Sequence, residues 1–178
     1  PWIFVIDSGA LEVPVPLDRE ATLRQAEKLL RQGKLDGAIA EFTRAIELRP
    51  DLAPAFANRA AAYVRQRDHQ RAISDFDPAI ELNPADAASL LARASIHATQ
   101  GHARRSIADL DRAVKIDPQL SVAYFKRGNA HLDLGELDRA LSDYDKAIEL
   151  DPRDAVAYFN RSLAHERADA REELVDLG

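Results

Sequence analysis

The chain contains no cysteine. This absence excludes a disulfide framework, a thiolate nucleophile and any zinc or iron–sulfur site built on cysteine. No run of about 18 apolar residues occurs either, so the sequence predicts no membrane-spanning segment. Only 7 glycines stand among 178 residues, of which 46% are hydrophobic. This composition indicates a globular, helix-rich chain and not a disordered one.

Positive charge is also in short supply. Lys and Arg total 24 against 30 Asp and Glu, which gives a net charge of −6. An acidic chain approaches phosphates against its own field, so nucleic acid is not expected as a partner. The sequence has no serine nucleophile elbow and no glycine loop that could cradle a phosphate. We therefore expect no catalytic residues, no cofactor and no metal, and we do not expect an enzyme.

What the chain does have is an internal repeat of 34 residues. The period is marked by four prolines that follow similar hexapeptides and by columns of alanine and aromatic residues. The prolines are Pro50, Pro84, Pro118 and Pro152. One column of large residues contains Phe42, Phe76, Leu110 and Tyr144. A fixed period of this length is typical of stacked repeat proteins, in which each unit hides its apolar face against the next.

Within each repeat the apolar residues recur at three- and four-residue steps, which predicts two helices and a tight turn. Gly33, Gly101 and Gly135 are expected to cap the first helices, because glycine accepts a left-handed conformation. Pro78 stands inside an expected helix and predicts a bend or loosened turn near 74–78. The expected helices are 19–32, 35–48, 53–66, 69–82, 87–100, 103–116, 121–134, 137–150 and 155–167.

The second repeat shows most clearly that the sequence resembles the tetratricopeptide repeat (TPR) family. It carries the family's small, aromatic, alanine and proline positions, namely Phe56, Ala60, Tyr63, Ala72, Phe76, Ala79 and Pro84. The resemblance implies an all-α, right-handed α-solenoid of stacked antiparallel helix pairs, a TPR superhelix. It divides the chain into an arm or linker (1–18), a TPR domain (19–167) and a tail (168–178). The repeats would be 19–52, 53–86, 87–120 and 121–154, with a capping helix at 155–167.

The same resemblance implies a concave groove lined by the first helix of each repeat, which would bind a peptide or partner protein. Amides there could hydrogen-bond the backbone of an extended peptide while apolar residues hold its side chains. The expected groove residues are Asn58, Arg65, Leu91, Ser95, Phe125, Lys126, Asn129, Phe159 and Asn160. Some TPR domains bind a C-terminal carboxylate with a set of Lys, Arg and Asn side chains from three repeats. Leu91, Ser95 and Val156 stand at three of those positions here, so the sequence does not predict this kind of binding.

Three further columns are assigned structural roles. His97, His131 and His165 are expected to replace an aromatic residue between helices and not to bind metal, because equivalent positions of stacked helices do not converge. Arg59, Arg93, Arg127 and Arg161 are expected to pair with Asp75, Asp109 and Asp143, since a buried Arg needs a partner. The doublets 75/77, 109/111 and 143/145 are expected to lie on solvated faces, because residues two apart on a helix point away from each other.

Two hypotheses for the function follow. The first is a protein–protein interaction module, and the alternative is a non-catalytic regulatory or scaffold segment of a larger polypeptide, which could be an enzyme. The start at Pro1, without a Met, motivates the alternative. The arm is either a linker or a segment in which Trp2, Ile3 and Phe4 dock on an apolar surface, so self-association through residues 1–18 is a further hypothesis.

Overall fold

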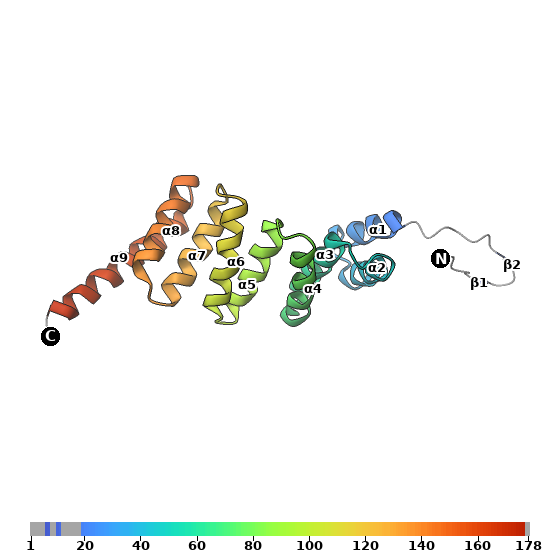
Figure 1. The fold of residues 1–178 in the computed structure, drawn as a ribbon, viewed down its shortest axis with the longest axis horizontal. Coiled ribbons are helices and arrows are strands. Elements are labelled where there is room, and N and C mark those ends of the chain that lie inside the picture. The colour runs from blue at the N-terminus through green and yellow to red at the C-terminus, as the bar shows by residue number, and fades with distance from the viewer. Residues whose placement is uncertain (1–5, 8–9, 12–18, 177–178) are drawn as a thin grey trace. The chain divides into compact units, whose positions relative to one another are not determined.

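The computed structural model describes residues 6–7, 10–11 and 19–176. It comprises two compact units, Pro1–Leu82 and Asn83–Gly178, which we describe separately (Figure 1). The docking arm proposed for Trp2, Ile3 and Phe4 lies outside the described residues.

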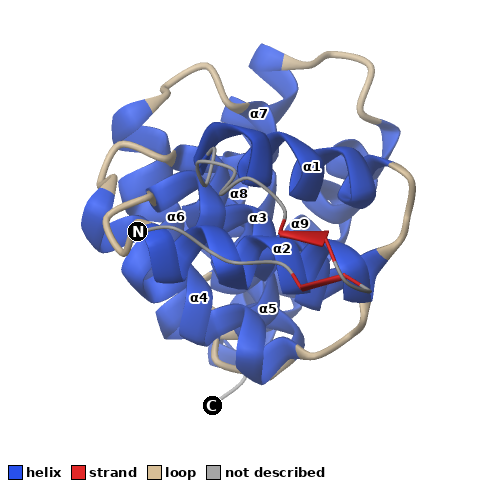
Figure 2. Cartoon of the chain, turned by 90° about the vertical axis from the view of Figure 1, so that its right-hand side faces the viewer, coloured by secondary structure: helices blue, strands red, loops and turns tan. Residues whose placement is uncertain are grey.

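In its described residues the first unit has two helix pairs and a short strand pair. Its elements are β1 (Ile6–Asp7), β2 (Ala10–Leu11), α1 (Arg19–Arg31), α2 (Leu35–Leu48), α3 (Ala53–Arg65) and α4 (His69–Leu82). Each helix packs on the next in sequence, and α1 also contacts α3. The strands, red in Figure 2, are antiparallel, with Ile6 opposite Leu11.

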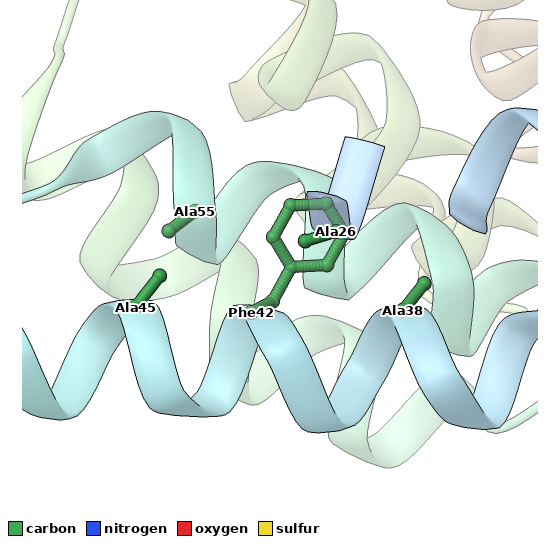
Figure 3. Packing of buried hydrophobic residues seen from close by; sticks show 5 residues of the cluster. All are labelled: Ala26, Ala38, Phe42, Ala45 and Ala55. Carbon is green, nitrogen blue, oxygen red and sulfur yellow. The ribbon is translucent and has the colours of Figure 1, made fainter. Parts of the chain in front are cut away.

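Phe42 of α2 fills the space between the helices of the first repeat (Figure 3). Its ring is fully buried, and around it lie small residues from three helices: Ala26, Ala38, Ala45 and Ala55. The alanines allow the helix backbones to approach closely enough for one large side chain to fill the core at native density. The column of small and large residues seen in the sequence is therefore a packing pattern.

The second unit continues the same arrangement with five helices in the described residues. They are α5 (Ala87–Thr99), α6 (Ala103–Ile116), α7 (Ser121–Asp133), α8 (Leu137–Leu150) and α9 (Ala155–Asp176). Consecutive helices pack together, and the first helices of successive repeats also touch, α5 against α7 and α7 against α9. The predicted all-α class with stacked antiparallel helix pairs is confirmed within each unit.

The helices begin at the residues that the sequence predicts. Gly33, Gly101 and Gly135 have φ of 74°, 74° and 72°, which confirms their role as left-handed caps. The second repeat places Arg67, with φ of 62°, at the equivalent position. The last helix differs from the prediction, because α9 continues to Asp176 and not to 167. No glycine or proline interrupts it, so nothing in its sequence ends the helix earlier.

Pro78 does not interrupt its helix. The α-helix α4 runs through it, from His69 to Leu82, although proline cannot donate a hydrogen bond to the preceding turn. In that turn Ser74 Oγ donates to the Gln70 carbonyl, at 3.1 Å. The helix is thus continuous through Pro78, and the bend or loosened turn near 74–78 stays a prediction.

Candidate functional site

Buried ion pairs fix the orientation of the first helix relative to the second in three repeats. In each, the arginine Nε and Nη2 donate to the two oxygens of an aspartate on the following helix. The pairs are Arg59–Asp75, Arg93–Asp109 and Arg127–Asp143, with distances of 2.6–2.9 Å. This confirms the predicted Arg–Asp pairing, and the two-point geometry is the strong form of such a contact.

The expectation of solvated aspartate doublets is therefore wrong for the first member of each doublet. Asp75, Asp109 and Asp143 are only 4–5% exposed, because they face the arginine of the preceding helix. The second members Asp111 and Asp145 have side chains 56% and 62% exposed, yet each accepts from an arginine of the next repeat at 2.7 Å. One doublet thus links two repeats.

Arg127 shows this linkage in full. It donates to Asp143 within its own repeat and, through Nη1, to Asp111 of the preceding one. The hydrogen bonds with Asp143 raise the pKa of the Arg127 guanidinium, in spite of its burial. The group therefore stays charged and clamps α6, α7 and α8 together.

Two of the three histidines in the column are buried as predicted. His97 is 8% and His131 7% exposed, whereas His165 on α9 is exposed. His131 Nδ1 lies 2.7 Å from Glu136 Oε2. Among the described residues, no group of three or more His, Cys, Asp or Glu is placed to hold a metal ion.

His97 makes the second unit sensitive to acid. Its buried Nδ1 has no hydrogen-bond partner. Burial lowers the pKa of the ring from its ordinary value of 6.5, and the positive charges of Arg93 and Arg105 lower it further, whereas the negative charge of Asp109 raises it. The unfolded chain therefore binds this proton more readily than the folded one. The contribution of neutral His97 to the free energy of unfolding should therefore be fully present above about pH 6.5. Below that pH it should decrease, by up to about 1.4 kcal/mol per pH unit.

The measurement is urea unfolding by circular dichroism at several pH values, for the wild type and for His97→Tyr. The variant has the residue that Tyr63 supplies at the same position of the second repeat. Every other titrating group is shared, so the difference between the two curves isolates His97. We expect the difference to grow as pH falls from 7 to 5, and a constant difference would show that His97 does not contribute.

The candidate binding surface of the second unit is formed by the first helices α5, α7 and α9. Its centre is Asn129, whose Oδ1 accepts hydrogen bonds from Tyr144 Oη and from Asn160 Nδ2, both at 2.8 Å. Asn129 Nδ2 and Asn160 Oδ1 have no partner among the described residues. Two half-buried amides on the first helices of successive repeats thus each keep one polar group without a partner in the described part of the chain, which is the kind of group that recognises a peptide backbone.

Tyr144 is the residue of this site that the sequence prediction missed. It reaches Asn129 from α8, through the core, and its side chain is fully buried. Burial and the nearby Asp133 raise the pKa of its phenol to about 12, so it remains a hydrogen-bond donor. The signal in the sequence was the hydroxyl itself, because the same column has Phe42, Phe76 and Leu110.

Apolar side chains flank the two amides. The Phe125 ring is half-buried, 6.1 Å from the Tyr144 ring between centroids. Phe159 is 68% and Val156 56% exposed, a large exposure for apolar residues on one helix. Lys126 is half-buried on α7 and adds a positive charge.

Other predicted groove residues are half-buried or use their polar groups in hydrogen bonds within the chain. In the second unit Ser95 Oγ donates to the carbonyl of Leu91, so this hydroxyl proton is used within α5. In the first unit Asn58 is half-buried on α3, and Arg65 Nη1 donates to the Leu30 carbonyl at 2.7 Å. The structure thus connects Phe125, Tyr144, Asn129 and Asn160 in the second unit, and Phe159 next to Asn160 in the sequence is exposed.

Comparisons with known proteins agree with this architecture. Models described as tetratricopeptide repeat match residues 58–121 and 121–154, and a model described as TPR repeat matches 26–66. No curated protein sequence matches the chain significantly. No helix in the part of the chain that the structure describes has the length and apolar character needed to cross a bilayer.

Several solved structures have a similar fold. The crystal structure of MamA protein is 23% identical, covers 89% of this chain and 86% of its own, and has a TM-score of 0.82. YrrB, a TPR protein with an unusual peptide-binding site, is 23% identical over 89% of this chain and 82% of its own, at 0.80. The first TPR of Spaghetti (RPAP3), bound to the HSP90 peptide SRMEEVD, is 22% identical over 66% and 93%, at 0.64.

The three family models together match residues 26–154 without a gap, and these residues include the prolines, the small and large columns and the helix pairs described above. The chain belongs to the tetratricopeptide repeat family.

Proposed function

We propose that the chain is a non-catalytic protein–protein interaction module that binds an extended segment of a partner protein on its first helices. The observation that carries the proposal is the Asn129–Asn160 amide pair, with one free donor and one free acceptor, beside the exposed Phe159. Part-buried hydrogen bonds from Tyr144 and between the two amides hold the pair in place, so little side-chain entropy is lost when it binds a peptide.

The fold relatives support a peptide as the ligand, since YrrB has a peptide-binding site and the RPAP3 domain binds an HSP90 peptide. The proposed chemistry differs from recognition of a terminal carboxylate. The surface of the second unit offers Lys126 among amides and aromatic rings, and Leu91, Ser95 and Val156 stand where carboxylate-binding TPR domains carry Lys or Asn. We therefore propose an internal, extended segment with apolar side chains as the ligand.

The first experiment selects a ligand from a display library of random peptides against the full chain and measures its affinity by fluorescence anisotropy. Phe159→Ala and the double variant Lys126→Ala/Asn129→Ala should each weaken binding at least tenfold, about 1.4 kcal/mol. Phe159 is 68% exposed, so its removal should change binding without changing stability.

The matched control is Ile116→Ala, since Ile116 is also an exposed apolar residue, 38% exposed, but lies on the second helix α6. It should bind as the wild type does. Equal affinity of all these variants would refute the proposal. A circular dichroism melt of the double variant is required, because Asn129 also accepts from Tyr144.

A further inference from the structure

The sequence of α9 is similar to that of α7. The similarity includes a helix face that does not line the proposed groove. Residues 156–165 read VAYFNRSLAH, and residues 122–131 read VAYFKRGNAH. Equivalent alanines are buried in both helices, Ala123 and Ala157 fully so. The same side of each helix thus faces inward, and the remaining positions can be compared one by one.

On α7 the face that contains Tyr124, Arg127, Gly128 and His131 is covered by α8. The Arg127 side chain is 19% exposed, and its Nε and Nη2 grip Asp143. A Cβ on Gly128 would lie 2.8 Å from the ring of Tyr144, so the two helices are in close contact there.

On α9 the equivalent face is open. Tyr158 is 42% exposed, the Arg161 side chain is 32% exposed, and Ser162 and His165 are exposed. The residue types that hold a second helix onto α7 are therefore present on α9 without such a helix among the described residues.

The donors of Arg161 make the comparison specific. Its Nη1 donates to Asp145 at 2.7 Å, just as Nη1 of Arg127 donates to Asp111. Its Nε and Nη2 have no partner in the described part of the chain, whereas in three other repeats these two atoms bind a carboxylate. The Tyr158 ring lies 5.4 Å from the guanidinium and helps to hold it in place.

We propose that the open face of α9 binds an amphipathic helix of a partner protein, placed as α8 is placed on α7. An Asp or Glu of that helix would pair with Arg161 Nε and Nη2. Asp145 and the Tyr158 ring already hold the positively charged guanidinium in place, so these two donors can bind a carboxylate at two points. The next residue of the helix would pack over Ser162. A Cβ at Gly128 would lie 2.8 Å from the Tyr144 ring. Ser162 has such a Cβ, so we place a Leu at this point of the partner helix, the residue that Leu110 supplies at the Tyr144 position of the third repeat.

The probe is a helical peptide with the sequence of α8, Leu137–Leu150, in which Tyr144 is replaced by leucine. A hydrocarbon crosslink between positions 138 and 142, both exposed on α8, keeps it helical. Fluorescence anisotropy should show saturable binding to the full chain. Arg161→Ala in the chain, or Asp143→Asn in the peptide, should each weaken binding at least tenfold.

Two controls define the surface. Arg171→Ala removes an exposed arginine of the same helix, and Phe159→Ala alters the proposed peptide groove; neither should change this affinity. Failure of the crosslinked peptide to saturate, or binding that is insensitive to Arg161→Ala, would overturn the proposal. Self-association of the chain that depends on Arg161, measured by sedimentation velocity without peptide, would also overturn it and assign the face to a second copy.

Discussion

Replacing Arg127 with alanine is expected to lower the free energy of unfolding of the second unit by about 3 kcal/mol. The change leaves Asp143, 5% exposed, as a buried carboxylate without its partner, and it also breaks the link to Asp111 of the preceding repeat. Removing one member of a buried pair is costly because the remaining charge has lost its water and its counter-charge. Urea unfolding by circular dichroism measures the loss, and hydrogen exchange should place it in α7 and α8.

Arg161→Ala is the matched control, since it occupies the same position of the next repeat. Its ion pair is with Asp145, whose side chain is 62% exposed, so we expect a loss below about 1 kcal/mol. The double variant Arg127→Ala/Asp143→Ala should lose less than the sum of its single changes, because no charge is left buried. Equal losses for Arg127→Ala and Arg161→Ala would show that burial of the pair does not matter.

Gly128→Ala is expected to destabilise the second unit by about 1–3 kcal/mol through overpacking, less about 1 kcal/mol from better helix propensity. The new Cβ would lie 2.8 and 2.9 Å from Cε1 and Cδ1 of the Tyr144 ring and 3.3 Å from the Ala140 carbonyl oxygen. The Tyr144 ring is fully buried and hydrogen-bonded to Asn129, so it cannot move away without loss. Urea unfolding by circular dichroism measures the change.

The compensating change is Tyr144→Leu, which recreates the Ala94–Leu110 combination of the third repeat. In that background Gly128→Ala should be close to neutral or stabilising, and the double-mutant cycle should give a favourable coupling energy. Gly37→Ala is the control, because its Cβ would lie 3.4 Å from Leu29 Cδ1, an ordinary contact. An equal cost of Gly128→Ala in the wild type and in the Tyr144→Leu background would contradict the steric explanation.

The periodic features of the structure could be predicted from the sequence. Positions that lie 34 residues apart have equivalent surroundings, so one correct assignment of helix, cap or Arg–Asp pair serves every repeat. The left-handed caps at Gly33 and Gly101 and the pair Arg93–Asp109 follow in this way. The burial of Asp143 was available from the same argument, since a carboxylate that pairs with a buried Arg must itself be buried.

The features that break the period could not be predicted in this way. The hydrogen bond from Tyr144 to Asn129 forms because the Tyr144 ring lies against Gly128 in the core and its hydroxyl reaches the first helix of the repeat. This packing depends on the three-dimensional arrangement of α7 and α8, which the sequence period does not contain. The length of α9 is a different case, because its uninterrupted sequence of helix formers already favoured an extension beyond 167.

These non-periodic features are also the ones that define the two proposed binding surfaces. The amide pair exists because the fourth repeat has Tyr144 where other repeats have Phe or Leu, and because Asn160 follows at the next helix. The second surface, the open face of α9, exists because Arg161 is present there while no second helix among the described residues supplies a carboxylate to its Nε and Nη2. In both surfaces a repeat departs from its neighbours in one side chain or one partner.

The most direct measurement for the proposed groove is an NMR titration of the full chain with a selected peptide, observing the side-chain amides of asparagine. We expect the Asn129 and Asn160 signals to shift with saturation, together with backbone signals of α7 and α9. Unchanged Asn129 and Asn160 signals, with shifts confined to α6 and α8, would contradict the account.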